Sequence, residues 1–487
     1  MLMHVPRLRL RVYILVSVIF LGLLWLLLPY DHDIVLNVRY HFNDITGTSK
    51  LDDGWTFEPA PFEIDPDDVA MVIKTGYSTQ ERLTAKLKAA SNTANPNNIV
   101  VVGDYSTSPS SHFRCNGIEV PVHNALDWML DKENISPQLN KTRLHYYSEL
   151  TSAIEAGDRE LAMSVGETHG WELDIMKASS ILSSFDFALR MPISVYSVII
   201  GYYGTFPIFD HVSGLELAFT MLPTKKWYVL LDDDTYILEP SLKILLDHLD
   251  SSVSHFLGNS VGGDKIKRFA HGGSAIVISH AALRRVFVDH PKVTSASNFE
   301  SLTAGWGDAL VASTLIKSGV YLEERYSHHF NGESPRITKI WPERFCSPLV
   351  SFHGLNPEHM VATGNVFKDI TKPVSWIGIW DLYEERTLSS FLTEPFRAGW
   401  DHVGRVDEAV LTTHAVTTQE DCLELCVSND DICLAWTWEE ENHTCHVSPW
   451  IIVGDAAEHK VTGINTHRAM ALSDQCAHPK STSKNYD

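Results

Sequence analysis

A run of five apolar residues, Trp227–Leu231, ends directly at three consecutive aspartates, Asp232–Asp234. A continuous apolar run of this length is typical of a strand buried on both faces, which requires helices on both sides of a sheet. Open sheets of this kind bind ligands at the carboxyl ends of their strands. The run therefore predicts an α/β fold with three carboxylates at a ligand site.

Other short apolar runs alternate with helical patterns, as expected of an open, mostly parallel α/β sheet. The further strands that we predict are Val69–Lys74, Ile99–Val102 and Ser274–Ser279. The predicted helices are Glu81–Ala90, Trp171–Leu189, Ser241–Leu249 and one that begins near His280.

The aspartate triplet is unusual because adjacent carboxylates at the end of a buried strand repel one another unless a cation neutralises them. Carboxylates and phosphate oxygens together are the usual ligands of Mg²⁺ or Mn²⁺. We therefore expect Asp232–Asp234 to hold a divalent ion that bridges the protein and a diphosphate. The alternative is a solvated acidic turn, since Asp is common after strands.

The N-terminus carries three arginines followed by an apolar run from Val12 to Leu28. The run is at the short end of the roughly 17–25 residues that cross a bilayer. Because arginines stay cytosolic, we expect a type II topology, with residues 1–11 in the cytosol, a single transmembrane signal-anchor at 12–30 and the remainder in the Golgi lumen. The alternative is a cleaved signal peptide, but the run is longer than a usual signal-peptide core and no A-x-A site follows.

Cysteine usage and glycosylation sequons agree with a lumenal address. Four of the seven cysteines lie in one short C-terminal stretch, which is typical of a disulfide-stapled module. Sequence alone permits three pairings of these four, and a zinc site is the alternative. The pairing of Cys115, Cys346 and Cys476 is not predicted. Sequons for N-glycans begin at Asn134, Asn140 and Asn442.

The overall charge limits the kinds of partner that the chain can bind. The chain has 39 basic and 61 acidic residues and a net charge of -22. A strongly acidic surface repels phosphate backbones, so we expect no nucleic-acid partner. A nucleotide remains compatible, because one metal ion and a few local charges can hold it.

The domain limits follow from changes in composition. Residues 31–65 are polar, contain Pro59 and Pro61 and show no sustained periodicity, which suggests a stem. We expect a catalytic domain at 66–390 and a cysteine-rich module at 400–475.

Four segments resemble, in order and spacing, the blocks of the glycosyltransferase family that includes Fringe and the core 1 β-1,3-galactosyltransferases. The match is best with the fungal branch and covers residues 65–370. The resemblance implies a GT-A-type nucleotide-sugar-binding open sheet. The four segments are Lys226–Tyr236, Phe269–Leu283, Gly305–Val320 and Trp341–Gly354.

The resemblance also implies roles for individual residues at the donor end of the site. Asp234 and His353 would coordinate Mn²⁺, with Mg²⁺ as the alternative ion. Asp232 would belong to the metal group and, with Asp233, orient the ribose and the diphosphate.

Further roles are implied around the rest of the site. Thr75 and Gly76 would touch the uridine, and Gly272 and Gly273 would let a sugar approach the backbone. Asp308 would be the general base. Relatives usually have two adjacent acidic residues where this chain has Gly307-Asp308. We expect the N–H groups at the start of the helix to lower the pKa of Asp308 and keep it ionised.

The C-terminal segment resembles a PAN/apple domain. The resemblance implies disulfides between Cys422 and Cys445 and between Cys426 and Cys433, and a protein or carbohydrate ligand. A structural cap without a ligand is the alternative.

The expected function is metal-dependent, inverting transfer of a hexose or N-acetylhexosamine from a UDP-sugar to a hydroxyl of a glycan or glycoprotein. A β-1,3 linkage is what the resemblance suggests. The alternative is a catalytically inactive lumenal protein that binds carbohydrate or acts as a scaffold.

Overall fold

The structure is a computed structural model that describes residues 22, 27–46, 53–90, 95–107, 113–135, 144–169, 210–262, 268–384 and 386–477. Most of the predicted anchor at 12–30 and the whole predicted helix Trp171–Leu189 lie outside these ranges. Among the described residues, no helix combines the length and the apolar character needed to cross a membrane.

A six-stranded open sheet forms the centre of the larger domain, in the order β5-β2-β1-β6-β11-β8. Only β11 runs antiparallel to its neighbours, so the sheet is mostly parallel, as predicted. The strands are β5 (Val122–Asn124), β2 (Ile99–Gly103), β1 (Val69–Thr75), β6 (Trp227–Asp232), β11 (Ile276–Ser279) and β8 (Phe256–Gly258). The four strands that the apolar runs predict all form.

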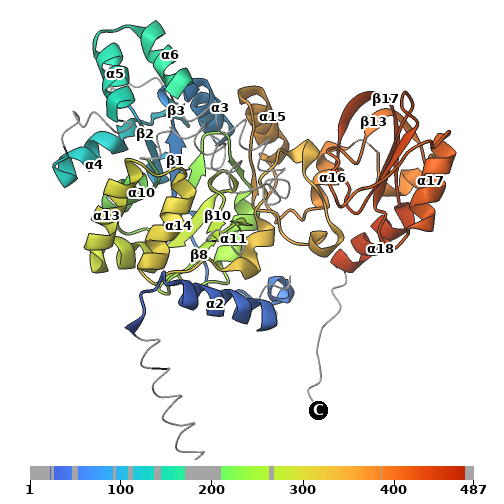
Figure 1. Cartoon of the computed structure of the whole chain (residues 1–487), viewed down its shortest axis with the longest axis horizontal. Helices are drawn as coiled ribbons and strands as arrows, with labels where there is room; N and C mark the ends of the chain where they lie inside the picture. The colour runs from blue at the N-terminus through green and yellow to red at the C-terminus, as the bar shows by residue number, and fades with distance from the viewer. Residues whose placement is uncertain are drawn as a thin grey trace, which may run out of the picture.

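Helices cover both faces of this sheet (Figure 1). Alternate strand residues such as Val72 and Leu230 pack with α10 and α14 on one face. The residues between them, such as Ile73 and Leu231, pack with α3 and α11 on the other. This arrangement explains the continuous apolar runs, because both sides of each strand are buried.

The helices of this domain range from five to twelve residues, and those predicted within the described residues are among them. They are α3 (Gln80–Ala90), α4 (Ala125–Glu133), α5 (Leu144–Glu155), α6 (Arg159–His169), α10 (Asp210–Met221), α11 (Glu239–Leu246), α12 (His280–Arg284), α13 (Pro291–Ser301), α14 (Gly307–Lys317), α15 (Pro357–Phe367) and α16 (Gly378–Tyr383).

Three two-stranded pairs lie outside the central sheet. They are β3 (Arg114–Cys115) with β4 (Ile118–Glu119), β7 (Tyr236–Ile237) with β12 (Ser351–Phe352), and β9 (Ser260–Val261) with β10 (Phe269–Ala270).

The expected stem contains a helix that the sequence pattern did not predict, α2 (Asp33–Thr46). Val35 and Leu36 of α2 are buried against the larger domain. Arg39 stacks on Tyr321, with its guanidinium carbon 3.8 Å from the ring centroid. At least this part of residues 31–65 is therefore packed on the larger domain.

A second, smaller domain follows, built on an antiparallel sheet in the order β13-β17-β15-β16-β14. Its elements are β13 (Arg397–Asp401), β14 (Leu411–Thr413), α17 (Gln419–Ser428), β15 (Ala435–Glu439), β16 (Thr444–Ser448), β17 (Asp455–Ile464) and α18 (Thr466–Ala477).

Disulfides tie α17 to this sheet. Cys422 is bonded to Cys445 and Cys426 to Cys433, which confirms the pairing that the resemblance implied. The zinc alternative is wrong, because all four sulfurs are used in disulfides.

The two domains share one hydrophobic core. Trp376 and Trp380 of the larger domain pack in the same cluster as Trp450 of the smaller one, and all three are buried. A third disulfide, Cys346–Cys476, joins the larger domain to α18. The domains are therefore held together by both packing and a covalent bond.

Candidate active site

The three aspartates lie at the carboxyl end of β6, as predicted, and they are buried. Each is only 3–4% exposed. The alternative of a solvated acidic turn is therefore wrong. The side chains instead face other charged groups of the chain at the carboxyl ends of β1 and β6, which are paired in register.

His353 reaches the triplet through the short antiparallel pair β7–β12. Phe352, the last residue of β12, pairs with Tyr236, so His353, which follows it, lies beside Thr235. His353 Nε2 is 3.4 Å from Asp234 Oδ1. The backbone that follows His353 is also fixed to the triplet, because the Leu355 amide donates a hydrogen bond to the Asp234 carbonyl at 3.2 Å.

Gly273 leaves room for this histidine. A β-carbon on Gly273 would lie 2.2 Å from His353 Nε2, which is too close for any side chain. The glycine that the resemblance assigned to the approach of a sugar is thus required by the chain's own imidazole. The hydroxyl of Thr235 donates to the Gly273 carbonyl at 2.8 Å and fixes the turn.

The residues present fit a divalent ion. Asp234 Oδ1 and His353 Nε2 are buried and form no hydrogen bond with any described residue. Together with Asp232 they offer ligand atoms that all lie within 4.8 Å of one another. Two carboxylates and an imidazole suit Mn²⁺, and orphaned acceptors that face one another are what a bound cation would satisfy.

Basic side chains that the sequence analysis did not assign also surround the triplet. Lys74 Nζ is 2.8 Å from Asp232 Oδ1. Arg82 forms ion pairs with Asp233, at 3.0 Å, and with Asp234. The expectation that a metal alone offsets the carboxylates is therefore incomplete. The sequence signal was a basic pair, Arg82 and Lys86, one turn apart on the buried face of α3.

These charges shift the pKa values within the site. Burial raises the pKa of Asp233 to about 6, although Arg82 opposes the shift. Burial acts in the same direction on Asp234, but the charges of His353 and Arg82 outweigh it and hold its pKa below the usual range. Asp234 therefore stays ionised more firmly than Asp233. Burial lowers the pKa of Lys86 to about 8.

Thr75 and Gly76, predicted to contact the uridine, follow β1 directly and border the triplet. The Thr75 hydroxyl donates to Asp233 Oδ2 at 2.8 Å. Gly76 donates its N–H to Thr79 Oγ1 at 3.0 Å. The neighbouring strand β2 is followed directly by Asp104, which the sequence analysis did not select and whose pKa burial raises to about 6.

Asp308, the predicted base, lies in the first turn of α14. Its carboxylate accepts from the amide of Gly272 at 3.1 Å and from that of Ala309 at 2.8 Å. The carboxylate therefore connects the glycine turn to its own helix. The expected lowering of its pKa is wrong: burial raises the pKa of Asp308 and outweighs both amides.

The neighbour of Asp308 is glycine for a local steric reason. A β-carbon on Gly307 would lie 2.1 Å from His211 Nδ1. His211 is buried, and its Nε2 lies 2.8 Å from Lys74 Nζ. Burial lowers the pKa of His211 well below its usual value. The imidazole thus occupies the room that an acidic side chain at residue 307 would need.

A second group of possible metal ligands lies away from this site. Asp53 Oδ1 is 2.8 Å from His328 Nε2 and 3.3 Å from His329 Nε2. Ser347 donates to the other oxygen of Asp53. These contacts tie the segment after α2 to the larger domain, so we interpret the group as a polar clamp.

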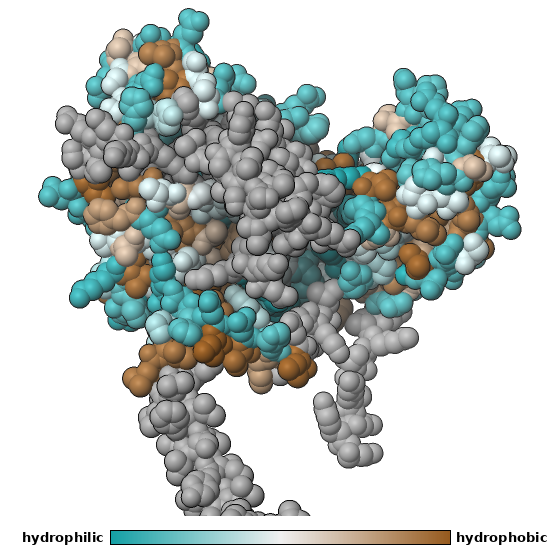
Figure 2. Space-filling view, in the orientation of Figure 1, coloured by the Kyte–Doolittle hydropathy of each residue, from teal (hydrophilic) through white to brown (hydrophobic). Residues whose placement is uncertain are grey.

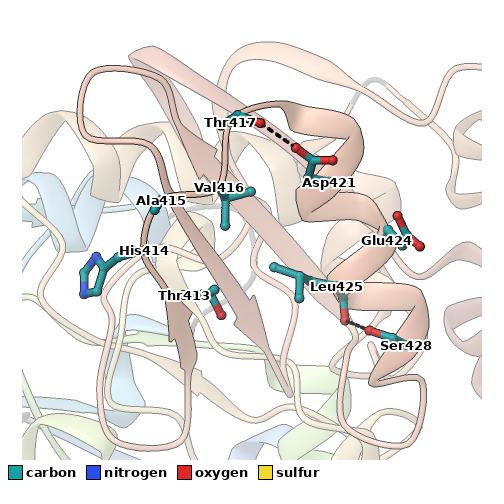
Figure 3. Close-up of a pocket in the computed structure, with 9 residues that line it drawn as sticks. All are labelled: Thr413, His414, Ala415, Val416, Thr417, Asp421, Glu424, Leu425 and Ser428. Carbon is teal, nitrogen blue, oxygen red and sulfur yellow. Dashed lines mark hydrogen bonds between the residues drawn. The ribbon is translucent and has the colours of Figure 1, made fainter.

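The smaller domain has an open hollow of about 410 Å³ between the end of β14 and α17 (Figure 3). Val416 and Leu425 line it, and Asp421 and Glu424 stand on its α17 side. The Thr417 hydroxyl donates to Asp421 at 2.9 Å. That this domain binds a protein or carbohydrate remains a prediction.

Three buried aspartates lie at the end of a central strand and face a histidine. This arrangement identifies the chain as an α/β protein with a candidate metal site. Comparison with known families specifies it further. Residues 211–380 match the family model of Fringe-like proteins, and residues 403–461 match that of the PAN domain. The chain therefore carries a Fringe-like domain, which supports a glycosyltransferase family, followed by a PAN domain. No match was found among curated proteins.

Proposed function

We propose that this protein is a metal-dependent, inverting glycosyltransferase that uses a UDP-sugar. The observation that carries the proposal is the pair of buried atoms Asp234 Oδ1 and His353 Nε2, which lie 3.4 Å apart without a hydrogen bond. Asp232 would complete the ligand set from the protein. When bound, Mn²⁺ would offset the charge that develops on the departing diphosphate.

Asp308 would remove the proton from the acceptor hydroxyl. Its two amide partners, Gly272 and Ala309, fix the carboxylate in one orientation. Its raised pKa makes the ionised form a stronger base than an ordinary aspartate. A single displacement at the anomeric carbon would invert its configuration.

The chain's own cations would help to hold the donor. Lys74 and Arg82 lie among the three aspartates at the end of the sheet. They would keep this region close to neutral and orient the diphosphate, while Thr75 and Gly76 would lie under the uridine. Electrostatic preorganisation of this kind is a large term in phosphate chemistry.

The remaining parts of the proposal rest on the family resemblance and the sequence. The donor sugar would be a hexose or an N-acetylhexosamine, and the acceptor a glycan or glycoprotein hydroxyl joined in a β-1,3 linkage. The protein would be a single-pass type II protein of the Golgi membrane with its catalytic domain in the lumen. The PAN domain would bind a protein or carbohydrate ligand.

The test is UDP release by the purified full chain with Mn²⁺ and, in turn, UDP-galactose, UDP-N-acetylglucosamine and UDP-glucose. We expect activity with one donor, its loss in EDTA and its loss in Asp234→Asn. Titration of Mn²⁺ followed by electron paramagnetic resonance should show weaker binding in the same variant. Asp289→Asn, at an exposed carboxylate, is the matched control. Full activity of Asp234→Asn would contradict the proposal.

A catalytically inactive lumenal binding protein is the second candidate, and one observation favours it. His211 fills the position next to Asp308 where relatives have a second acid. In that case Mn²⁺ and UDP would still bind, and none of the donors would be consumed.

A further inference from the structure

The polar clamp at Asp53 has the composition of a metal site. Its two histidines, His328 and His329, end the 3₁₀ helix η7 (Glu324–His329) and are 7% and 0% exposed. Their Nε2 atoms lie 2.8 and 3.3 Å from one and the same atom, Asp53 Oδ1. All three ligand atoms lie within 4.8 Å of one another. One carboxylate oxygen and two imidazole nitrogens therefore face one another in a largely enclosed position.

The proton of His329 is placed by the partner of its other ring nitrogen. Nδ1 lies 2.8 Å from the carbonyl oxygen of Pro348, which can only accept, so Nδ1 carries the proton. A neutral His329 then presents a lone pair at Nε2 toward Asp53 Oδ1, which is also an acceptor. Two acceptors 3.3 Å apart require either a second proton on the ring or a cation between them.

The groups around these ligands are those that orient ligands at metal sites. The Pro348 carbonyl fixes the ring of His329, and the Ser347 hydroxyl donates to Asp53 Oδ2. A carbonyl on the second nitrogen of a histidine and a hydrogen bond to a ligating carboxylate are the usual outer partners of metal ligands. The site therefore has outer partners as well as ligands.

The main chain of both histidines is also fixed. Trp376 Nε1 donates to the His328 carbonyl at 3.0 Å, and the Val350 amide donates to the His329 carbonyl at 2.8 Å. His328 Nδ1 is buried and forms no hydrogen bond with any described residue, so no such partner fixes the tautomer of this ring. Its Nε2 can therefore also present a lone pair to an ion.

The ligand types specify the ion. Two imidazoles and one carboxylate suit Zn²⁺ with a water as fourth ligand, whereas the two carboxylates and one imidazole at the aspartate triplet suit Mn²⁺. Tetrahedral zinc with bonds of about 2.0–2.1 Å separates its ligand atoms by about 3.3 Å. The distance of 3.3 Å between His329 Nε2 and Asp53 Oδ1 matches this separation.

We propose that Asp53, His328 and His329 bind one zinc ion, and that the polar clamp is the ion-free form of this site. The ion would join Asp53 to a residue 275 positions later in the chain. Zinc bound by the folded chain stabilises it, because the unfolded chain lacks the preformed site. The proposal is independent of the proposed transferase activity.

The location of the site indicates what the ion would hold in place. Helix α2 runs along the lower edge of the larger domain (Figure 1), where the outward surface is largely apolar (Figure 2). Ile34, Val38 and Ile45 of α2 are 49–83% exposed, so they contribute little to attaching this part of the chain. The zinc ion would add a fixed point between the segment after α2 and the larger domain.

The experiment titrates zinc into the purified full chain after treatment with EDTA, in competition with a chromophoric chelator. Asp53→Asn removes the charged ligand and nearly preserves its shape, and His328→Gln removes an imidazole. The matched control is His359→Gln, at an exposed histidine on α15. Asp234→Asn separates the new site from the aspartate triplet.

We expect tight binding of one zinc ion in the wild type, in His359→Gln and in Asp234→Asn. Asp53→Asn and His328→Gln should bind it at least about 100-fold more weakly, since losing a ligand should cost no less than losing its support. Zinc should also raise the midpoint of thermal unfolding of the wild type but not of Asp53→Asn.

Equal zinc affinity in the wild type and Asp53→Asn would overturn the proposal. Tight binding that disappears in Asp234→Asn would place the ion at the aspartate triplet and overturn it as well. If a variant does not fold, the wild type alone decides, because a chain without a tightly bound zinc ion contradicts the proposal. Paramagnetic resonance of Mn²⁺ in Asp53→Asn should match the wild type, and UDP release tests the activity separately.

Discussion

The imidazole of His211 lies where a side chain at residue 307 would have to lie, since a β-carbon on Gly307 would approach its Nδ1 to 2.1 Å. The two residues begin neighbouring helices, α10 and α14, at the edge of the candidate active site. His211 also contacts Lys74, which pairs with Asp232. The absence of a second acid beside Asp308 is therefore coupled to how the site is packed.

The first prediction follows from this steric conflict. Alanine ordinarily stabilises a helix over glycine by about 1 kcal/mol. Gly307→Ala should instead lower the midpoint of thermal unfolding, because overpacking costs about 1–3 kcal/mol. Adding His211→Ala should reverse the sign of the Gly307→Ala effect, which a double-mutant cycle would measure. Additive effects would show that His211 does not constrain residue 307.

A second prediction concerns the histidine that faces Asp234. Gly273→Ala would place a β-carbon 2.2 Å from His353 Nε2 and force the ring to move. We expect Mn²⁺ to bind about 10–100-fold more weakly, as when the support of a metal ligand is lost. Gly305→Ala is the matched control, because its added carbon would meet no described atom within 4 Å beyond its two chain neighbours. Equal Mn²⁺ affinity of the two variants would exclude His353 as a ligand.

The predicted base can be tested by rate and by pH. Asp308→Asn keeps one acceptor for the amides but removes the base, so kcat should fall by about 10²-fold or more. Calorimetry should show nearly unchanged binding of UDP with Mn²⁺. A variant that transfers sugar normally but unfolds at a lower temperature would make Asp308 a structural residue.

The pH dependence of the wild-type enzyme has a definite sign. Because burial raises the pKa of Asp308, the ionised base is lost at a higher pH than for an ordinary aspartate. The acid limb of kcat/KM should therefore lie above about pH 3.9, the usual value. An acid limb at or below that value would contradict the assignment.

The clamp at Asp53 predicts a pH-dependent stability. Burial would raise the pKa of Asp53, but the hydrogen bonds from His328 and His329 outweigh it and hold the pKa below its usual range. Its stabilising effect is therefore present above about pH 3.9, the value in the unfolded chain, and is lost as the pH falls further. Asp53→Asn should cost about 1–3 kcal/mol at neutral pH.

The measurement is the midpoint of thermal unfolding from pH 7 down to pH 3. The difference between the wild type and Asp53→Asn should be largest at neutral pH and shrink below about pH 4. Asp289→Asn, whose side chain is exposed, should show no such trend. A difference that stays constant with pH would mean that the charge of Asp53 does not stabilise the fold.

Much of the fold could be predicted from sequence, because helices on both faces of the central sheet make its strands continuously apolar. Trp227–Asp232 is the clearest case, because both the strand and the ligand site at its carboxyl end could be predicted from the sequence. Helix α2 could not be predicted in this way. Its apolar residues Ile34, Val38 and Ile45 are exposed, whereas only Val35 and Leu36 among the apolar residues of α2 are buried.

The candidate site was predictable only in part. The aspartates and His353 follow strands, so their place at one edge of the sheet could be inferred. The contacts of Lys74, Arg82 and His211 depend on side chains that meet only in the folded chain. The pKa of Asp308 was predicted with the wrong sign, because helix-terminal amides are visible in sequence whereas the extent of burial is not.

The junction of the two domains, with its shared core and the Cys346–Cys476 bond, has a geometric consequence. A flexible linker lets a binding domain sample many separations from an active site and so average over substrates. This junction removes that averaging. If the PAN domain binds part of the acceptor, as proposed, that part would be held at one separation and one angle from Asp308, and acceptors of one length would be preferred.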